Sequence, residues 1–160
     1  MNKKILYIDM DGVLVDLDHG IELWKKSYPE SVSKYTGRFD LIPDIFKTSL
    51  PTHGAVDAIN VLNESNKYDM FIATSSPWDN PPALTDKRNW IETYFGSIFK
   101  KKFITTHRKD LLVGDYLIDD RLKNGAGEFK GELLRFGVDW ENNYSVNEYP
   151  DWGAILNKLL

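Results

Sequence analysis

Near its start the chain reads Ile5-Leu6-Tyr7-Ile8-Asp9-Met10-Asp11-Gly12, a short apolar run that ends in an acidic turn. An unbroken apolar run of this length is typical of a strand that is covered on both faces, as in a parallel sheet. Asp and Gly favour tight turns, so the strand is expected to end at Asp9. The segment therefore predicts a buried strand with two carboxylates just beyond its end.

Four further apolar runs repeat this pattern along the chain. They are Met70–Ala73, Phe103–Ile104, Tyr116–Ile118 and Leu133–Phe136. Apolar residues at helical spacing lie between or after them, in residues 55–62, 90–95 and 152–159. Strands that alternate with helices predict an α/β fold, with a parallel central sheet and helices on both faces.

Two stretches interrupt the alternation of strands and helices. Residues 16–50 contain five aromatic residues together with Pro29, Gly37 and Pro43. We interpret them as a small cap inserted into a core formed by residues 1–15 and 51–160. Residues 78–84 lie among three prolines and predict a loop. The following helix would then begin at Thr85 or Asp86, either of which is a candidate N-cap, and stop at Gly96.

Composition limits the class of protein. The 160 residues correspond to one domain, and 42% hydrophobic with 28% charged residues is typical of a soluble globular protein. The chain has no cysteine, which excludes disulfides and thiolate metal sites and suits a cytoplasmic protein. A net charge of −4 argues against binding a nucleic-acid polymer, and no apolar run approaches the ~20 residues of a membrane span. The oligomeric state is left open, a homodimer included.

Polar side chains follow four of the predicted strands. In chain order they are Asp9 and Asp11, Thr74 and Ser75, Lys109, and Asp119 and Asp120. Ligands bind at the carboxyl ends of the strands in open α/β sheets, so we expect these residues to converge on one edge. Each cluster alone is also typical of an ordinary turn, cap or surface charge. The prediction of a site depends on the set.

The chemistry of this set points to phosphoryl transfer. Carboxylates held close together repel one another, and a hard divalent cation such as Mg²⁺, which prefers oxygen ligands, relieves the repulsion. An aspartate can also attack phosphorus as a nucleophile, while lysine and hydroxyl groups offset charge on the phosphoryl oxygens. The residues alone thus predict a Mg²⁺-dependent phosphoryl-transfer site.

The motifs resemble a known superfamily. Asp9-Met10-Asp11-Gly12-Val13-Leu14 resembles the first motif of the haloacid dehalogenase (HAD) superfamily, and Thr74, Lys109 and Asp119-Asp120 resemble the other three. Residues 71–75, 90–96 and 117–121 are similar to the 5′(3′)-deoxyribonucleotidase family. The resemblance implies a three-layer α/β/α, HAD-like (Rossmann-like) fold. It also implies a Mg²⁺-dependent phosphatase that hydrolyses deoxyribonucleoside monophosphates through an aspartyl-phosphate.

The resemblance also implies a role for each site residue. Asp9 would be the nucleophile, and Asp11 would protonate the leaving oxygen and later deprotonate the attacking water. Thr74 and the Ser75 backbone would bind phosphate oxygens, and Lys109 would offset charge on the phosphoryl group and on Asp9.

The implied metal site draws on the same residues. Mg²⁺ would be held by the carboxylates of Asp9 and Asp120 and by the backbone carbonyl of Asp11. Asp119 would support these ligands from an outer position or share the metal.

The cap departs from the family pattern, because Leu17 stands where the family has an aromatic residue that stacks on the base. Other aromatic residues of the cap either rebuild a stacking surface or form the cap's own core; they are Trp24, Tyr28, Tyr35, Phe39 and Phe46. Three alternative functions stay open. They are a HAD phosphatase for another small phosphoester, a phospho-accepting signalling domain, and a nucleotide-binding protein without turnover.

Overall fold

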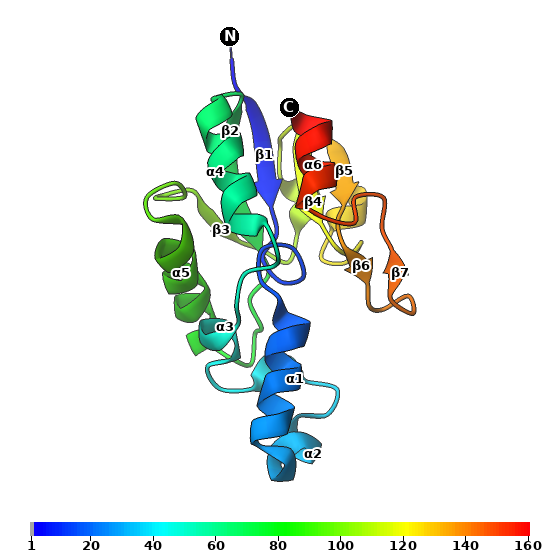
Figure 1. Cartoon of the computed structure of the whole chain (residues 1–160). Helices are drawn as coiled ribbons and strands as arrows, with labels where there is room; N and C mark the ends of the chain where they lie inside the picture. The colour runs from blue at the N-terminus through cyan, green and yellow to red at the C-terminus, as the bar shows by residue number, and fades with distance from the viewer. Residues whose placement is uncertain (1) are drawn as a thin grey trace.

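The computed structural model describes residues 2–160, and a parallel sheet of five strands forms its centre (Figure 1). The strands are β1 (Lys4–Ile8), β2 (Tyr68–Thr74), β3 (Phe103–Thr105), β4 (Tyr116–Asp119) and β5 (Glu132–Arg135). Their order is β3-β2-β1-β4-β5, so β1 lies in the middle and pairs with β2 and β4. The five predicted strands and the HAD-like fold class are confirmed.

Alternate residues of the strands face two different cores. On one face, Leu6 and Ile8 pack with three helices, α4 (Ala55–Ser65), α5 (Pro82–Phe95) and α6 (Trp152–Leu159). On the other face, Tyr7 and Leu117 pack with Ala126 and Phe129. Short 3₁₀ helices cover that second face, η3 (Lys109–Leu111) and η4 (Ala126–Glu128). The sheet is therefore buried on both sides, as its apolar strands require.

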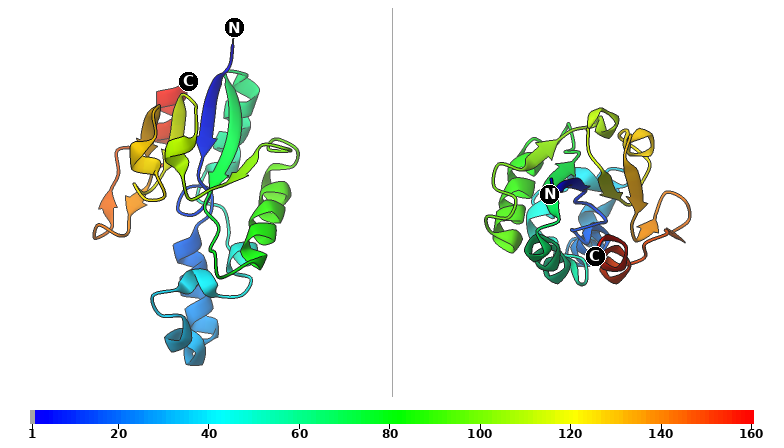
Figure 2. Two further views of the ribbon diagram at one scale, coloured as in Figure 1. Left: turned by 180° about the vertical axis from the view of Figure 1, so that it is seen from behind. Right: turned by 90° about the horizontal axis from the view of Figure 1, so that it is seen from above.

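We call residues 16–50 the cap segment. It holds short helices only: α1 (Leu17–Ser27), η1 (Pro29–Ser31), α2 (Val32–Tyr35), η2 (Phe39–Leu41) and α3 (Ile45–Thr48). The segment lies beyond the carboxyl ends of the strands, at the end of the molecule opposite both termini (Figures 1 and 2).

Most aromatic residues of the cap segment pack within it. Phe46 is buried in a cluster with Ile42 and Ile45, which Ala83 of α5 joins from the core. Three further aromatic residues pack against this cluster, namely Trp24, Tyr35 and Phe39. Tyr28 is half exposed, and it lines a cavity of about 530 Å³ with Trp24 and Tyr35. Packing of the cap's own core is therefore the main role that the contacts show for these residues.

Helix α5 corrects one prediction. It begins at Pro82, so Thr85 and Asp86 lie inside the helix and the predicted loop is too long at its end. Proline suits the first helical turn because its fixed φ matches the helix and its missing N–H has no partner there anyway. A hairpin of β6 (Val138–Asp139) and β7 (Ser145–Val146) was not expected. Among residues 2–160, every helix is too short or too polar to cross a bilayer.

We expect Trp90 to stabilise the junction between the core and the cap segment. Its indole Nε1 donates a hydrogen bond of 2.7 Å to the carbonyl oxygen of Ser49, and both residues are buried. Trp90→Phe leaves that carbonyl unpaired, so the free energy of unfolding should fall by about 1–3 kcal/mol in urea denaturation. Trp78 is 87% exposed and serves as the control. Trp78→Phe should change stability by less than about 0.5 kcal/mol, and equal losses would contradict the assignment.

Candidate active site

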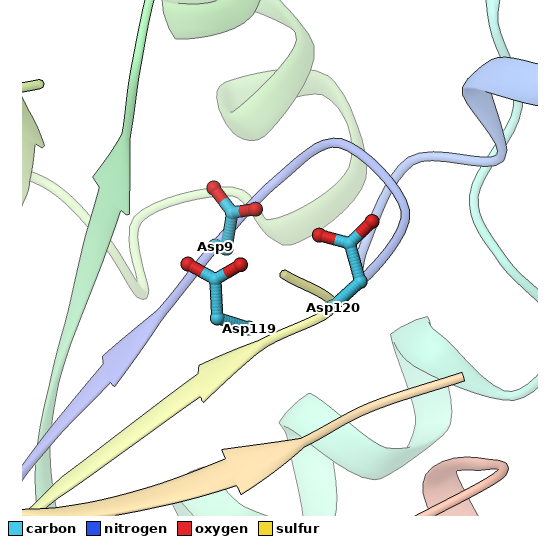
Figure 3. Close-up of side chains that lie close together, drawn as sticks. All are labelled: Asp9, Asp119 and Asp120. Atoms are coloured by element: carbon cyan, nitrogen blue, oxygen red, sulfur yellow. The ribbon is translucent and has the colours of Figure 1, made fainter. Parts of the chain in front are cut away.

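The register of the sheet brings the acidic residues together. Ile8 of β1 pairs with Ile118 of β4, and the backbone N–H of Asp9 donates to the carbonyl of Ile118 at 3.0 Å. Asp9 and Asp119 therefore leave neighbouring strands at the same level. Carboxylate oxygens of Asp9, Asp119 and Asp120 lie within 4.8 Å of one another, and all three residues are buried (Figure 3).

A tight turn after β1 closes over this cluster. The carbonyl of Met10 accepts hydrogen bonds from the N–H groups of residues 13, 14 and 15, while Gly12 has φ of +74°. A side chain at residue 12 would be strained at that φ, and its Cβ would overlap the Asp120 carboxylate. Glycine at this position therefore lets the turn lie directly against Asp120.

Lys109 neutralises part of the cluster. It lies in η3 and is buried, with its Nζ 2.9 Å from Asp9 and 2.5 Å from Asp119. Its backbone N–H donates to the carbonyl of Asn124 at 2.7 Å, which fixes the turn that carries it. Burial by itself lowers the pKa of Lys109, but Asp9 and Asp119 together raise that pKa above its ordinary value. The side chain therefore stays cationic between the two carboxylates.

A second lysine, Lys87 of α5, joins the remaining predicted residues. Its Nζ donates to the Asp11 carboxylate at 2.7 Å, to the Thr74 hydroxyl at 3.1 Å and to the Ser75 carbonyl at 2.7 Å. Asn124 donates from its side chain to the Ser75 hydroxyl at 3.2 Å. The structure thus brings every predicted site residue to the carboxyl edge of the sheet.

Sequence reasoning missed Lys87 and Asn124. Lys87 had a detectable signal, because it lies at helical spacing from Ala83, Trp90 and Ile91 on the buried face of α5. A lysine at a core position is rarely buried unless it has partners. Asn124 lies in a loop after the fourth motif, and nothing in its spacing marks it.

The acidic residues have strongly perturbed pKa values. Burial and the neighbouring charges of Asp9 and Asp119 raise the pKa of Asp120 to about 9. Burial raises the pKa of Asp119 to about 6. Burial also raises the pKa of Asp11, although Lys87 opposes this shift. Without a further cation the site therefore holds more carboxylate than it can keep ionised at neutral pH.

The oxygens fit a hard cation. One buried carboxylate oxygen of Asp11 and one of Asp120 have no hydrogen-bond partner among residues 2–160. Buried polar atoms in folded proteins almost always have a partner, so the orphaned oxygen of Asp120, which lies in the acidic cluster, suits a bound ion. The orphaned oxygen of Asp11 suits a second group that enters the site. An all-oxygen donor set is the one that Mg²⁺ prefers.

Comparison with known proteins identifies relatives of this chain. Residues 20–149 match the family model described as "5′ nucleotidase, deoxy (Pyrimidine), cytosolic type C protein". A protein of Vibrio phage KVP40, provisionally named 5′(3′)-deoxyribonucleotidase, is 45% identical over 161 residues, which cover 99% of this chain and 85% of the phage protein.

Two further relatives are more distant. The human cytosolic-type 5′(3′)-deoxyribonucleotidase is 27% identical over 139 residues, covering 71% of this chain and 69% of the human protein. A haloacid dehalogenase-like hydrolase of Streptococcus pneumoniae has a solved structure that matches with a TM-score of 0.61 at 13% identity, covering 99% of both chains. This last match shows that the fold is shared.

The raised pKa of Asp120 predicts a pH-dependent stability for the metal-free protein. The folded chain holds this proton up to about pH 9, whereas the unfolded chain loses it near pH 4. Between these values the folded state binds more protons, so stability falls as the pH rises. Asp120→Asn cannot ionise. In EDTA at pH 8 it should be more stable than the native chain by at least about 1 kcal/mol, or about 2–4 °C in Tm.

Thermal unfolding followed by circular dichroism at several pH values measures this difference. The advantage of Asp120→Asn should shrink as the pH falls towards 4, because the unfolded chain then begins to bind the same proton. If the variant is less stable than the native chain at pH 8, ionisation of the Asp120 carboxylate does not destabilise the metal-free protein.

Proposed function

The chain belongs to the 5′(3′)-deoxyribonucleotidase family of HAD phosphatases, and from this premise we propose that it hydrolyses deoxyribonucleoside monophosphates to nucleoside and phosphate. The observation that carries the proposal is the buried arrangement of Asp9, Lys109 and Asp119 beside Asp11 and the end of β2. A carboxylate nucleophile, a second carboxylate and a fixed cation are the groups that a two-step phosphate transfer needs. The human relative's cytosolic type supports a cytoplasmic location for this chain too.

In the first step, the Asp9 carboxylate attacks phosphorus and the bond from phosphorus to the nucleoside oxygen breaks. Asp11 gives its proton to that leaving oxygen, and phosphate remains on Asp9 as an acyl phosphate. In the second step, Asp11 takes a proton from water, the water oxygen attacks phosphorus, and the Asp9 carboxylate is released. Thr74, the Ser75 N–H and Lys109 hold the phosphoryl oxygens through both steps.

We also propose which residues would hold a divalent ion. Both oxygens of Asp119 are engaged, one by Lys109 at 2.5 Å and one by the backbone N–H of Arg121 at 3.0 Å. Asp120 instead has an oxygen without a partner among the chain's described atoms. We therefore assign Asp9, Asp120 and the Asp11 carbonyl as ligands, with Asp119 orienting Lys109. A bound Mg²⁺ supplies charge neutralisation for the carboxylates and the phosphoryl group.

The cap segment is proposed to cover the substrate at this edge. It is tied to the loop after β2, because the Asn80 side chain donates to the Asp40 carbonyl at 2.9 Å and Arg38 contacts Asp79 at 3.4 Å. That loop follows Thr74 and Ser75 directly. Residues 16–50 are thus held next to the phosphate-binding residues, where a leaving nucleoside would lie.

Asp9→Asn tests the nucleophile. Asparagine keeps the size of the side chain but cannot form the acyl phosphate, so kcat should fall at least about 10³-fold. Phosphate release from a panel of deoxyribonucleotides, ribonucleotides and sugar phosphates, with Mg²⁺ or EDTA, measures the effect. Asp57→Asn, at an exposed position of α4, is the matched control and should retain full activity. Near-native turnover by Asp9→Asn would rule out this mechanism.

The same panel separates the two phosphatase alternatives. We expect Mg²⁺-dependent release to be fastest with deoxyribonucleoside monophosphates. A preference for sugar phosphates would keep the phosphatase chemistry but overturn the nucleotide assignment.

Mg²⁺ should stabilise the native chain, because the ion binds the folded site and relieves carboxylate repulsion. At a concentration of about 100 times its Kd, the ion adds about 2.7 kcal/mol, or about 5–10 °C in Tm for a chain of this size. Asp120→Asn loses a ligand and should show less than half of this shift. Thermal unfolding with and without Mg²⁺ measures both, and an equal shift in the two proteins would remove Asp120 from the ligand set.

A further inference from the structure

Lys87 is the most deeply buried charged residue near the proposed site, and the mechanism above gives it no role. Its exposed fraction is 0%, although it comes from the helix α5 and not from a strand end that carries one of the motifs. Burying an ammonium group is costly unless oxygens surround it. Three oxygens do so here, from Asp11, Thr74 and Ser75, at 2.7–3.1 Å.

The cap segment closes the remaining side of this ammonium group. The ring of Phe46, from α3, has its centroid 4.6 Å from the Lys87 Nζ, and Phe46 is itself buried. The attraction between a cation and an aromatic face is strongest where water is excluded. Lys87 is therefore held from four directions and has little freedom to move.

The two carboxylate oxygens of Asp11 have different surroundings. Oδ2 accepts the 2.7 Å hydrogen bond from Lys87, whereas Oδ1 is buried and has no partner within the part of the chain that the structure describes. One oxygen is thus anchored, and the other is left free for a group that enters the site. A carboxylate held in this way can turn only slightly about its Cβ–Cγ bond.

We propose that Lys87 is a positioning residue, which anchors Asp11 so that its free oxygen meets the leaving oxygen of the substrate. The inference rests on the proposed function, because it assumes that Asp11 transfers the proton. Proton transfer needs the donor within hydrogen-bond reach of the leaving oxygen, so a small rotation of Asp11 is enough to slow the step.

A purely structural role for Lys87 predicts something different. If the lysine only joined the end of β2 to the cap segment, its loss would disturb Thr74 and Ser75 and slow every phosphate ester alike. If it positions the acid, its loss matters for alkoxide leaving groups, which need a proton. It matters little for p-nitrophenolate, which departs as a stable anion.

The test compares two substrates of Lys87→Met in the full chain with saturating Mg²⁺. Methionine keeps the length and the apolar stem of the side chain but removes the donors. The rate measured is that of leaving-group release in a single turnover, before the phosphate on Asp9 is hydrolysed, because Asp11 acts on that later hydrolysis equally for both substrates. We expect this rate for deoxyuridine 5′-monophosphate to fall about 10²-fold, the usual contribution of a positioned general acid. For p-nitrophenyl phosphate, the same rate should fall less than fivefold. Equal losses in this rate for the two substrates would overturn the proposal.

Two further variants complete the design. Asp11→Asn should show the same split between substrates, and adding Lys87→Met to it should cost no more activity, because both changes remove one function. Lys102→Met is the matched control, since Lys102 pairs with Asp69 at 2.5 Å near the opposite end of β2. It should leave kcat unchanged for both substrates.

Folding and the proposed function are tested separately. Thermal unfolding shows whether Lys87→Met folds. If it does not fold, the two substrates are compared in Lys87→Gln instead, which keeps a hydrogen-bond donor. A native chain that releases no phosphate from any deoxyribonucleoside monophosphate of the panel would refute the proposed function. An active native chain whose Lys87 variants slow both substrates equally would refute only the role of Lys87.

Discussion

Repulsion between carboxylates is the constraint on which the rest of this structure depends. The parallel register of β1 and β4 forces Asp9 and Asp119 together, and the adjacent Asp120 and Asp11 add two more acidic groups. Two buried lysines offset part of this negative charge. Lys109 lies between Asp9 and Asp119, and Lys87 pairs with Asp11. If all four acids are ionised, these two cations leave two negative charges uncompensated. A divalent cation completes that balance.

Helix α5 connects this electrostatic centre to the cap segment. One face of the helix carries Ala83 into the apolar cluster of the cap segment, Lys87 into the site, and Trp90 against Ser49. These residues follow one another at helical spacing. A single rigid helix therefore fixes all three contacts together. The geometry of the candidate site and the packing of the core are therefore not independent in this chain.

The sequence was informative where chemistry and periodicity coincide. The run from Ile5 to Ile8 is apolar without interruption because the strand is covered on both faces, and the acidic turn after it can be recognised from residue types alone. The sequence pattern predicts too late a start for α5, because Pro81 and Pro82 indicate a loop as readily as a first helical turn. Local patterns cannot separate these two uses of proline.

Other features depend on contacts between distant residues. The spacing of Lys87 marks it as a core lysine, but its partners Asp11 and Thr74 come from the turn after β1 and the end of β2, more than ten residues away along the chain. Likewise, the choice between base stacking and cap packing for Phe46 depends on its neighbour Ala83, which belongs to α5 and lies far from Phe46 along the chain. Tertiary structure decides such contacts, so the partners of Lys87 and Phe46 could not be predicted.

The contact between the Phe46 ring and the Lys87 ammonium group limits how the substrate specificity of this protein can evolve. An enzyme whose cap is a separate module can acquire a new substrate by exchanging that module whole. Here a ring from the cap segment helps to enclose the Lys87 charge that contacts Asp11, so replacing the segment would also alter the surroundings of that carboxylate. New specificity would therefore require α3 and α5 to change together, because the contact between Phe46 and Lys87 joins them.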